Sequence, residues 1–114
     1  MEAKAVAKYI RMSPRKTRLV ADMIRGKSVD DAINALHFIP QRASSPVEKA
    51  VRSAAANAVN QEAGAKLNPE DLFVKAIWVD QGPTMRRYSP GPMGRAYIVR
   101  KRSCHLTVVV SDKR

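Results

Sequence analysis

The 114-residue chain has few aromatic residues, few acidic residues and a single cysteine. Aromatic side chains make up 5% of the sequence, so a core must be built from Ala, Val, Ile, Leu and Met. One cysteine, Cys104, excludes an internal disulfide and the cysteine spacing of a zinc site. No apolar run approaches the roughly 20 residues of a transmembrane helix, and no signal peptide is evident. We therefore expect a soluble, intracellular single domain, residues 1–114, with no membrane partner.

The scarce acidic residues are separated from most of the basic ones. Residues 1–28 contain eight basic and two acidic residues, residues 29–81 five and seven, and residues 82–114 eight and one. The whole chain carries a net charge of +11. Such segregation predicts two basic contact surfaces for an anionic partner on a nearly neutral body.

Features of an enzyme are missing as well. Residues 81–111 contain no Asp or Glu, whereas a nuclease is expected to bring acidic metal ligands to its cationic surface. The chain has no glycine-rich phosphate loop, and His37 and His105 are lone histidines that belong to no Cys/His cluster with metal-ligand spacing. We expect no catalytic residue, no metal site and no cofactor.

Capping residues and apolar spacing predict two helices in the first forty residues. The first begins at Ser13 and Pro14, because serine caps free amides and proline fits the first helical position. It ends at Gly26, a residue suited to a left-handed cap. The second begins after Ser28 and ends before Pro40.

An alanine-rich third helix and three strands complete the prediction. The helix begins between residues 41 and 46 and ends near residue 62. Strands are predicted at residues 3–10, Leu72–Asp80 and Ala96–Ser111, which are rich in β-branched residues or alternate in polarity. We expect Trp78 to pack in the core or on the sheet, and Cys104 to be an inert apolar residue of a strand.

Residues 82–102, GPTMRRYSPGPMGRAYIVRKR, form a basic arm that cannot belong to the core. The segment has six basic residues, no acidic residue, three prolines and three glycines. The apolar pattern stops near Asp80 and resumes near Cys104, so two extended legs joined around Ser89–Gly94 would reach about 35 Å beyond the body. A bare ribbon is marginally stable in water, which favours an anionic partner such as nucleic acid. Tyr88 and Tyr97 are either cross-strand partners or surfaces on which bases stack.

Physical reasoning leaves two classes of nucleic-acid-binding protein open. One is an architectural DNA-binding protein whose basic β-arm enters a groove. The other is a structural protein embedded in RNA, whose extended arm threads between RNA segments and orders on contact.

Five segments, in order, carry a resemblance to a known family. They are SPRKTRLVADMIRGKSVDDA (13–32), SAAANA (53–58), VDQGPTMRRYSP (79–90), GRA (94–96) and KRSCHLTVVVSDK (101–113). Together they closely resemble the bacterial-type ribosomal protein twenty-two of the large subunit. The resemblance implies an α+β fold, with a three-stranded antiparallel sheet packed on three helices in the order β-α-α-α-β-β. A long β-hairpin protrudes from this sheet.

The resemblance also implies a role and partners. The protein would be a structural constituent of the large ribosomal subunit that binds 23S-type ribosomal RNA and aids assembly. Its partners would be that RNA, neighbouring large-subunit proteins and, at the hairpin tip, the nascent polypeptide in the exit tunnel. It would act as a monomer within a cytoplasmic ribosome or that of an organelle of bacterial descent.

Site residues are carried over by matching positions. The RNA-binding group at the first helix and its ends comprises Arg11, Ser13, Pro14, Arg15, Lys16, Arg18, Arg25 and Lys27. The RNA-binding group on the arm comprises Met85, Arg86, Arg87, Tyr88, Gly94, Arg95, Arg100, Lys101 and Arg102. The tunnel tip comprises Ser89, Pro90, Gly91, Pro92 and Met93.

The chain departs from the family pattern at the tip. Basic residues are usual where this chain has Gly91 and Met93, and an acidic residue is common where it has Tyr97. We therefore expect a tip that carries less charge and is more apolar.

Overall fold

A computed structural model describes residues 2–61 and 71–112 of the chain. The predicted order of elements is confirmed, with boundaries close to those expected. The helices and strands are β1 (Glu2–Ile10), α1 (Pro14–Ile24), α2 (Val29–Phe38), α3 (Ser44–Gln61), β2 (Phe73–Gln81), β3 (Met85–Pro90), β4 (Ala96–Lys101) and β5 (Cys104–Ser111), and a short 3-10 turn, η2 (Pro92–Gly94), joins β3 to β4.

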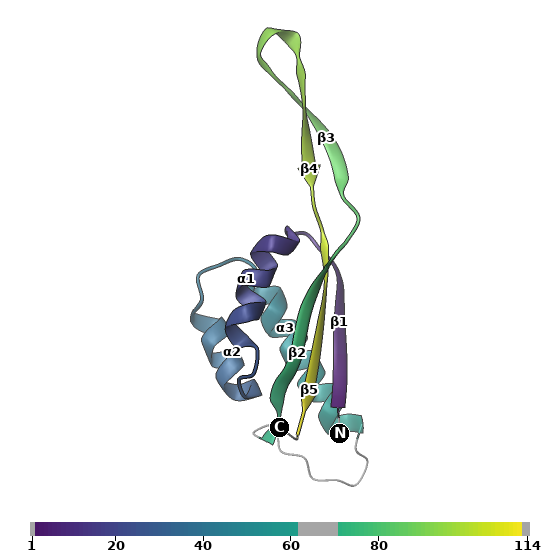
Figure 1. The fold of residues 1–114 in the computed structure, drawn as a ribbon. Helices are drawn as coiled ribbons and strands as arrows, with labels where there is room; N and C mark the ends of the chain where they lie inside the picture. Colours follow the sequence, from purple (N-terminus) through teal and green to yellow (C-terminus); the bar gives the residue numbers. More distant parts are fainter. Residues whose placement is uncertain (1, 62–70, 113–114) are drawn as a thin grey trace.

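The body is a three-stranded antiparallel sheet with helices on one face (Figure 1). Strand β5 lies in the centre, between β1 and β2. Helix α3 packs against β1 and β5, α1 against β2, and α2 against α3. The predicted α+β class is therefore confirmed.

Alternation along β5 builds the core. Leu106, Val108 and Val110 are fully buried on the face toward the helices, as their spacing predicted. Helix α3 faces them with small side chains, including the fully buried Ala54 and Ala58, which let the helix approach the sheet closely.

Trp78 does not lie in the core. It stands between the buried Ile77 and Val79 on β2, so alternation directs it to the sheet face opposite the helices. Its side chain is 43% exposed, and its cross-strand neighbour is Thr107. Cys104 is fully buried as a free thiol, as expected.

The outer edge of β2 is covered by the chain around α1. Gly26, with a φ of +83°, lets the backbone turn so that its amide donates to the Val74 carbonyl at 3.1 Å. The Val74 amide donates in return to the Lys27 carbonyl at 2.9 Å. Further along the edge, Arg25 Nη2 donates to the Ile77 carbonyl at 2.8 Å and Arg18 Nη2 to the Val79 carbonyl at 3.0 Å. Carbonyl groups of an edge strand thus find partners within the molecule.

Residues 96–111 form two strands of different sheets rather than the one strand predicted. The interruption lies at Arg102 and Ser103, where the Ser103 hydroxyl donates to the Pro83 carbonyl at 2.6 Å. The Gly82 amide donates to the Ser103 carbonyl at 3.0 Å, and a Cβ on Gly82 would lie 2.7 Å from Ser103 Oγ. The two legs therefore meet tightly where the arm leaves the body.

The arm is a two-stranded ribbon, β3 paired with β4, that projects from the body (Figure 1). It makes the molecule elongated, with extents of 66 × 25 × 17 Å and a radius of gyration of 17.3 Å. A compact chain of about this size would have a radius of gyration of roughly 13 Å.

We expect backbone amides of residues 83–101 to exchange quickly with solvent in the free protein, while those of residues 106–110 stay protected. The ribbon has no second layer, whereas β5 is the buried central strand. Hydrogen–deuterium exchange followed by NMR measures both segments in one sample. Equal protection would contradict a marginally stable arm.

Replacing Arg18 with Ala should lower the free energy of unfolding by about 1 kcal/mol, because the bond to the Val79 carbonyl is lost. Arg15→Ala is the matched control, since Arg15 is exposed on the same helix and donates none of the side-chain bonds seen among residues 2–61 and 71–112. Urea unfolding of both variants gives the comparison. If they unfold at the same midpoint, Arg18 does not support the edge.

Candidate nucleic-acid interface

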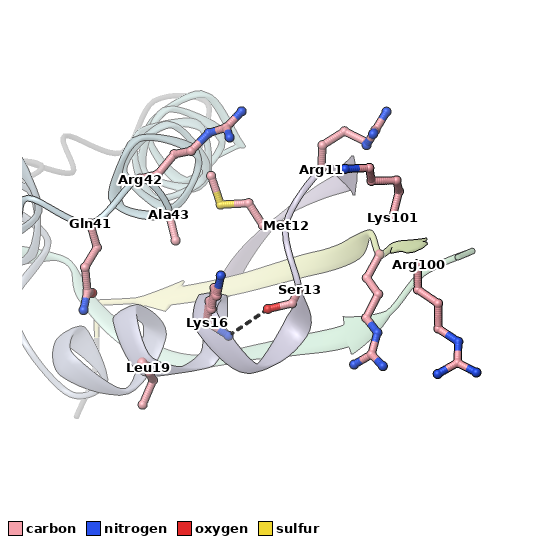
Figure 2. A pocket seen from close by; sticks show the side chains of 11 residues that line it. Arg11, Met12, Ser13, Lys16, Leu19, Gln41, Arg42, Ala43, Arg100 and Lys101 are labelled. Atoms are coloured by element: carbon pink, nitrogen blue, oxygen red, sulfur yellow. Dashed lines mark hydrogen bonds between the residues drawn. The ribbon is translucent and has the colours of Figure 1, made fainter. Parts of the chain in front are cut away.

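A basic pocket lies where α1 begins, beside the base of the arm (Figure 2). Its volume is about 630 Å³. Three segments distant in sequence meet there: the start of α1, the turn between α2 and α3, and the end of β4. The lining residues are Arg11, Met12, Ser13, Lys16, Leu19, Gln41, Arg42, Ala43, Arg100, Lys101 and Arg102. Six are basic and none is acidic.

The start of α1 is fixed by hydrogen bonds to a cap and to the core. Ser13 Oγ accepts from the Lys16 amide at 3.4 Å, as its position before Pro14 predicted. Thr17 is fully buried, and its hydroxyl donates to the Ser13 carbonyl at 3.1 Å. Cys104 Sγ contacts the same hydroxyl at 3.5 Å, which connects the helix start to β5. Because this face is held inward, Lys16 remains exposed at the pocket.

The cations of the pocket are not neutralised within the described parts of the chain. The ion pairs seen there are Arg25–Asp22, Arg52–Glu48 and Lys75–Glu2, and none involves a pocket residue. Figure 2 shows Met12 between Arg42 and Ser13, with Arg11 and Lys101 on the side toward the arm. Six cations around one hollow repel each other unless an external anion is present.

The arm repeats this imbalance along its length. Arg86 and Arg100 are direct cross-strand partners, and Met85 pairs with Lys101. Like charges placed opposite each other destabilise a strand pair. The guanidinium of Arg87 donates to the Arg86 carbonyl at 3.1 Å, so its contact is with the arm itself. The ribbon therefore has a charge pattern that favours binding of a polyanion over isolation in water.

The structure brings only part of the predicted basic groups together. Arg11, Ser13, Lys16 and residues 100–102 meet in the pocket. The other residues predicted on the arm, including Arg95 near the tip, lie along the ribbon away from the pocket. Arg15 and Lys27 are exposed on the body, outside the pocket lining.

Three residues of the predicted α1 group have structural roles. Pro14 is buried as the first helical residue. Arg18 and Arg25 donate to carbonyls of the β2 edge, and Arg25 also pairs with Asp22 at 2.8 Å. Their guanidinium groups keep further N–H donors beyond these bonds.

Sequence reasoning missed five residues of the pocket. Arg42 and Gln41 lie in the nearly neutral middle region, where an isolated cation gives no signal of a site. Met12, Leu19 and Ala43 are apolar, so charge patterning could not select them. Only the turn between α2 and α3 brings residues 41–43 to the start of α1.

The tip of the arm is closed by a local contact between Gly91 and Tyr97. A Cβ on Gly91 would lie 2.4 Å from Cε2 of the Tyr97 ring and 2.9 Å from the Arg95 carbonyl oxygen. The Gly91 amide donates to that carbonyl at 2.6 Å. Met93 follows in the left-handed region, with a φ of 59°, and is 96% exposed.

Within residues 2–61 and 71–112, no group of three or more His, Cys, Asp or Glu could hold a metal ion. Helices of sufficient length and apolar character to cross a membrane do not occur in these segments.

Comparison with known proteins gives a consistent result along nearly the whole chain. Residues 5–111 match the family model described as Ribosomal protein L22p/L17e. The chain is 57% identical over 114 residues to the large ribosomal subunit protein uL22 of Pelotomaculum thermopropionicum, covering 100% of this chain and 98% of that protein. It is 53% identical to the protein of the same name from Desulforamulus reducens, with the same coverage. Against that of Deinococcus radiodurans it is 52% identical over 109 residues, covering 96% of this chain and 79% of the other.

Replacing Gly91 with Ala should displace the Tyr97 ring, because the new methyl group would overlap its edge. In the unmodified chain we expect the Gly91 Hα protons to be shifted by the ring current of Tyr97. The shift should vanish in Tyr97→Leu and persist in Arg95→Ala, which retains the carbonyl that accepts from Gly91. NMR detects this shift of the Gly91 protons even if the ribbon opens often, because Gly91 and Tyr97 lie in the same short turn. Random-coil Gly91 shifts in the unmodified chain would refute the contact.

Proposed function

Because the chain belongs to the ribosomal protein L22p/L17e family, we propose that it binds large-subunit ribosomal RNA through the basic pocket and the arm. The chain is accordingly a ribosomal protein of the large subunit and not an enzyme. In this proposal residues 1–114 act as one RNA-binding unit, in which the body carries the pocket and residues 82–102 are the arm.

The observation that carries the proposal is the pocket, which has six cations and no acid, and whose cations form none of the ion pairs seen among the described residues. The arm extends the same chemistry, since residues 82–102 contain no acidic side chain. Cations that neutralise phosphates release condensed counterions, and this release drives binding to nucleic acid. A surface of this kind favours binding of a polyanion over binding of a protein of mixed charge.

The shape of the molecule supports a role in assembly. The arm carries its tip away from the body, so the pocket at its base and the tip can contact different RNA segments of the folded subunit. Phosphates bound beside Arg86 and Arg100 would remove the repulsion across the ribbon, so the arm gains stability on binding. In the proposed mechanism the body anchors first and the arm orders between RNA segments.

The tip and the rest of the surface complete the proposal. Residues 89–93 would line the nascent-chain exit tunnel, where Met93 presents an uncharged, exposed side chain. Neighbouring large-subunit proteins would contact other faces of the body, including the open face of the sheet around Trp78. The chain would act as a monomer within the ribosome, in the cytoplasm or in an organelle of bacterial descent.

The tagged chain should sediment with the large subunit at low magnesium after a high-salt wash, and ribonuclease but not deoxyribonuclease should release it. Replacing Arg11, Lys16 and Arg42 with Gln should deplete the chain from that fraction, because three phosphate-binding cations of the pocket are lost.

A variant with Lys4, Lys8 and Lys49 replaced by Gln is the matched control, since it loses the same charge outside the pocket. Migration as a free dimer, or release by deoxyribonuclease, would contradict the proposal. Either result would favour an architectural DNA-binding protein. Equal depletion of both variants would show that net charge, rather than the pocket, determines binding.

A further inference from the structure

We infer that the basic pocket holds one unpaired nucleotide, with its base on an apolar floor and its phosphates on the cationic rim. The floor is defined by Met12, Leu19 and Ala43, and the rim by the six basic residues of the lining. This inference rests on the proposed binding of RNA and specifies which part of the RNA the pocket takes.

The pocket has the dimensions of a site for a small ligand. Its volume of about 630 Å³ falls within the range of roughly 300–1,000 Å³ seen for ligand pockets. A surface that bound only the outside of an RNA helix would need cations but no hollow between them. The hollow therefore indicates an occupant that projects from the RNA backbone.

The floor is suited to a flat, weakly polar group. Ala43 is 4% exposed and Met12 packs partly against the core, so both hold the floor in place. Leu19 is 57% exposed although it lies on the pocket side of α1. A base covering Leu19 and Met12 would remove apolar surface from water, and the methionine sulfur contacts π-systems favourably.

The rim supplies the remaining groups that a nucleotide requires. Arginine binds phosphate oxygens in a bidentate manner and also stacks on planar rings, and the rim contains four arginines. Gln41, at the same pocket, carries an amide with both a donor and an acceptor for a base edge. Sequence-specific recognition of RNA mostly uses such unpaired bases, because the grooves of an RNA helix expose little sequence information.

An acidic peptide would be the competing occupant, and two observations favour a nucleotide. The end of β4 that lines the pocket continues directly into the basic arm, so one continuous polyanion can occupy both. Peptides commonly bind by adding a strand to a free sheet edge. The β2 edge beside α1 is already engaged by Arg18, Arg25 and the backbone of residues 26–29.

A bulkier apolar side chain on the pocket floor, which leaves the net charge unchanged, tests the inference. Leu19→Trp should weaken binding to a transcript of bacterial large-subunit ribosomal RNA about tenfold, because the indole would occupy the place of the base. The slope of log affinity against log salt should not change, since no phosphate contact is removed.

Met23→Trp is the matched control and should bind within about twofold of the unmodified chain. Met23 lies one turn further along α1, is 50% exposed and does not line the pocket. Circular dichroism spectra should show that both variants are folded. If Leu19→Trp binds as tightly as Met23→Trp, the pocket does not hold a base. If the unmodified chain fails to bind the transcript at all, the proposed function itself fails.

Photo-crosslinking locates the occupant directly and does not depend on the tryptophan variant. A benzophenone amino acid replaces Leu19 in the full chain, and large subunits containing it are irradiated and mapped by reverse transcription. The inference expects one dominant crosslink, to an unpaired nucleotide. A crosslink to a paired nucleotide, a crosslink to a protein, or none would overturn it while leaving RNA binding by the chain intact. Absence of the chain from large subunits would count against the proposed function instead.

Discussion

The outer edge of β2 determines where the basic pocket lies. Its carbonyl groups need partners, and α1 with the residues that follow it supplies them through Arg18, Arg25 and the backbone at Gly26. Helix α1 is therefore held along this edge, with its first turn beside the point where the arm leaves the body. Together with the buried Thr17 beside Cys104, that anchorage sets the position of the cations at the start of α1 relative to those at the end of β4.

The fold separates side chains that stabilise the body from those that face outward. The core consists of small and medium apolar residues, among them the alanines of α3 and the valines of β5. Such a core tolerates few buried charges. Most of the basic residues therefore remain on the surface, and two of the exposed arginines serve the protein itself by bonding to the β2 edge. A cation in the sequence is thus not sufficient evidence of an RNA contact.

Much of the fold was predictable because local rules determine it. Ser13, Ser28 and Gly26 mark helix ends by capping chemistry, and the alternation on β5 identified its buried face. The apolar pattern that resumes near Cys104 located the base of the arm, but the break in strand pairing at Arg102 and Ser103 depends on tertiary bonds at Gly82 and Ser103. Trp78 was expected in the core or on the sheet, and its place between the buried Ile77 and Val79 puts it on the sheet face opposite the helices.

The site was predictable only as far as charge density reveals it. The basic ends of the chain indicated the cations of α1 and the arm, but the contribution of Gln41 and Arg42 depends on the turn between α2 and α3. The apolar floor left no signal in the sequence, because Met12, Leu19 and Ala43 resemble ordinary core residues. Their place in the pocket lining follows only from the tertiary structure.

The contact at the tip has a consequence for how this chain can change over time. A Cβ at position 91 would overlap both the Tyr97 ring and the Arg95 carbonyl oxygen, so a side chain there requires the ring to move and the backbone of the turn to shift. While the tip keeps this conformation, position 91 is closed to a basic side chain, and the apex at residues 89–93 stays uncharged.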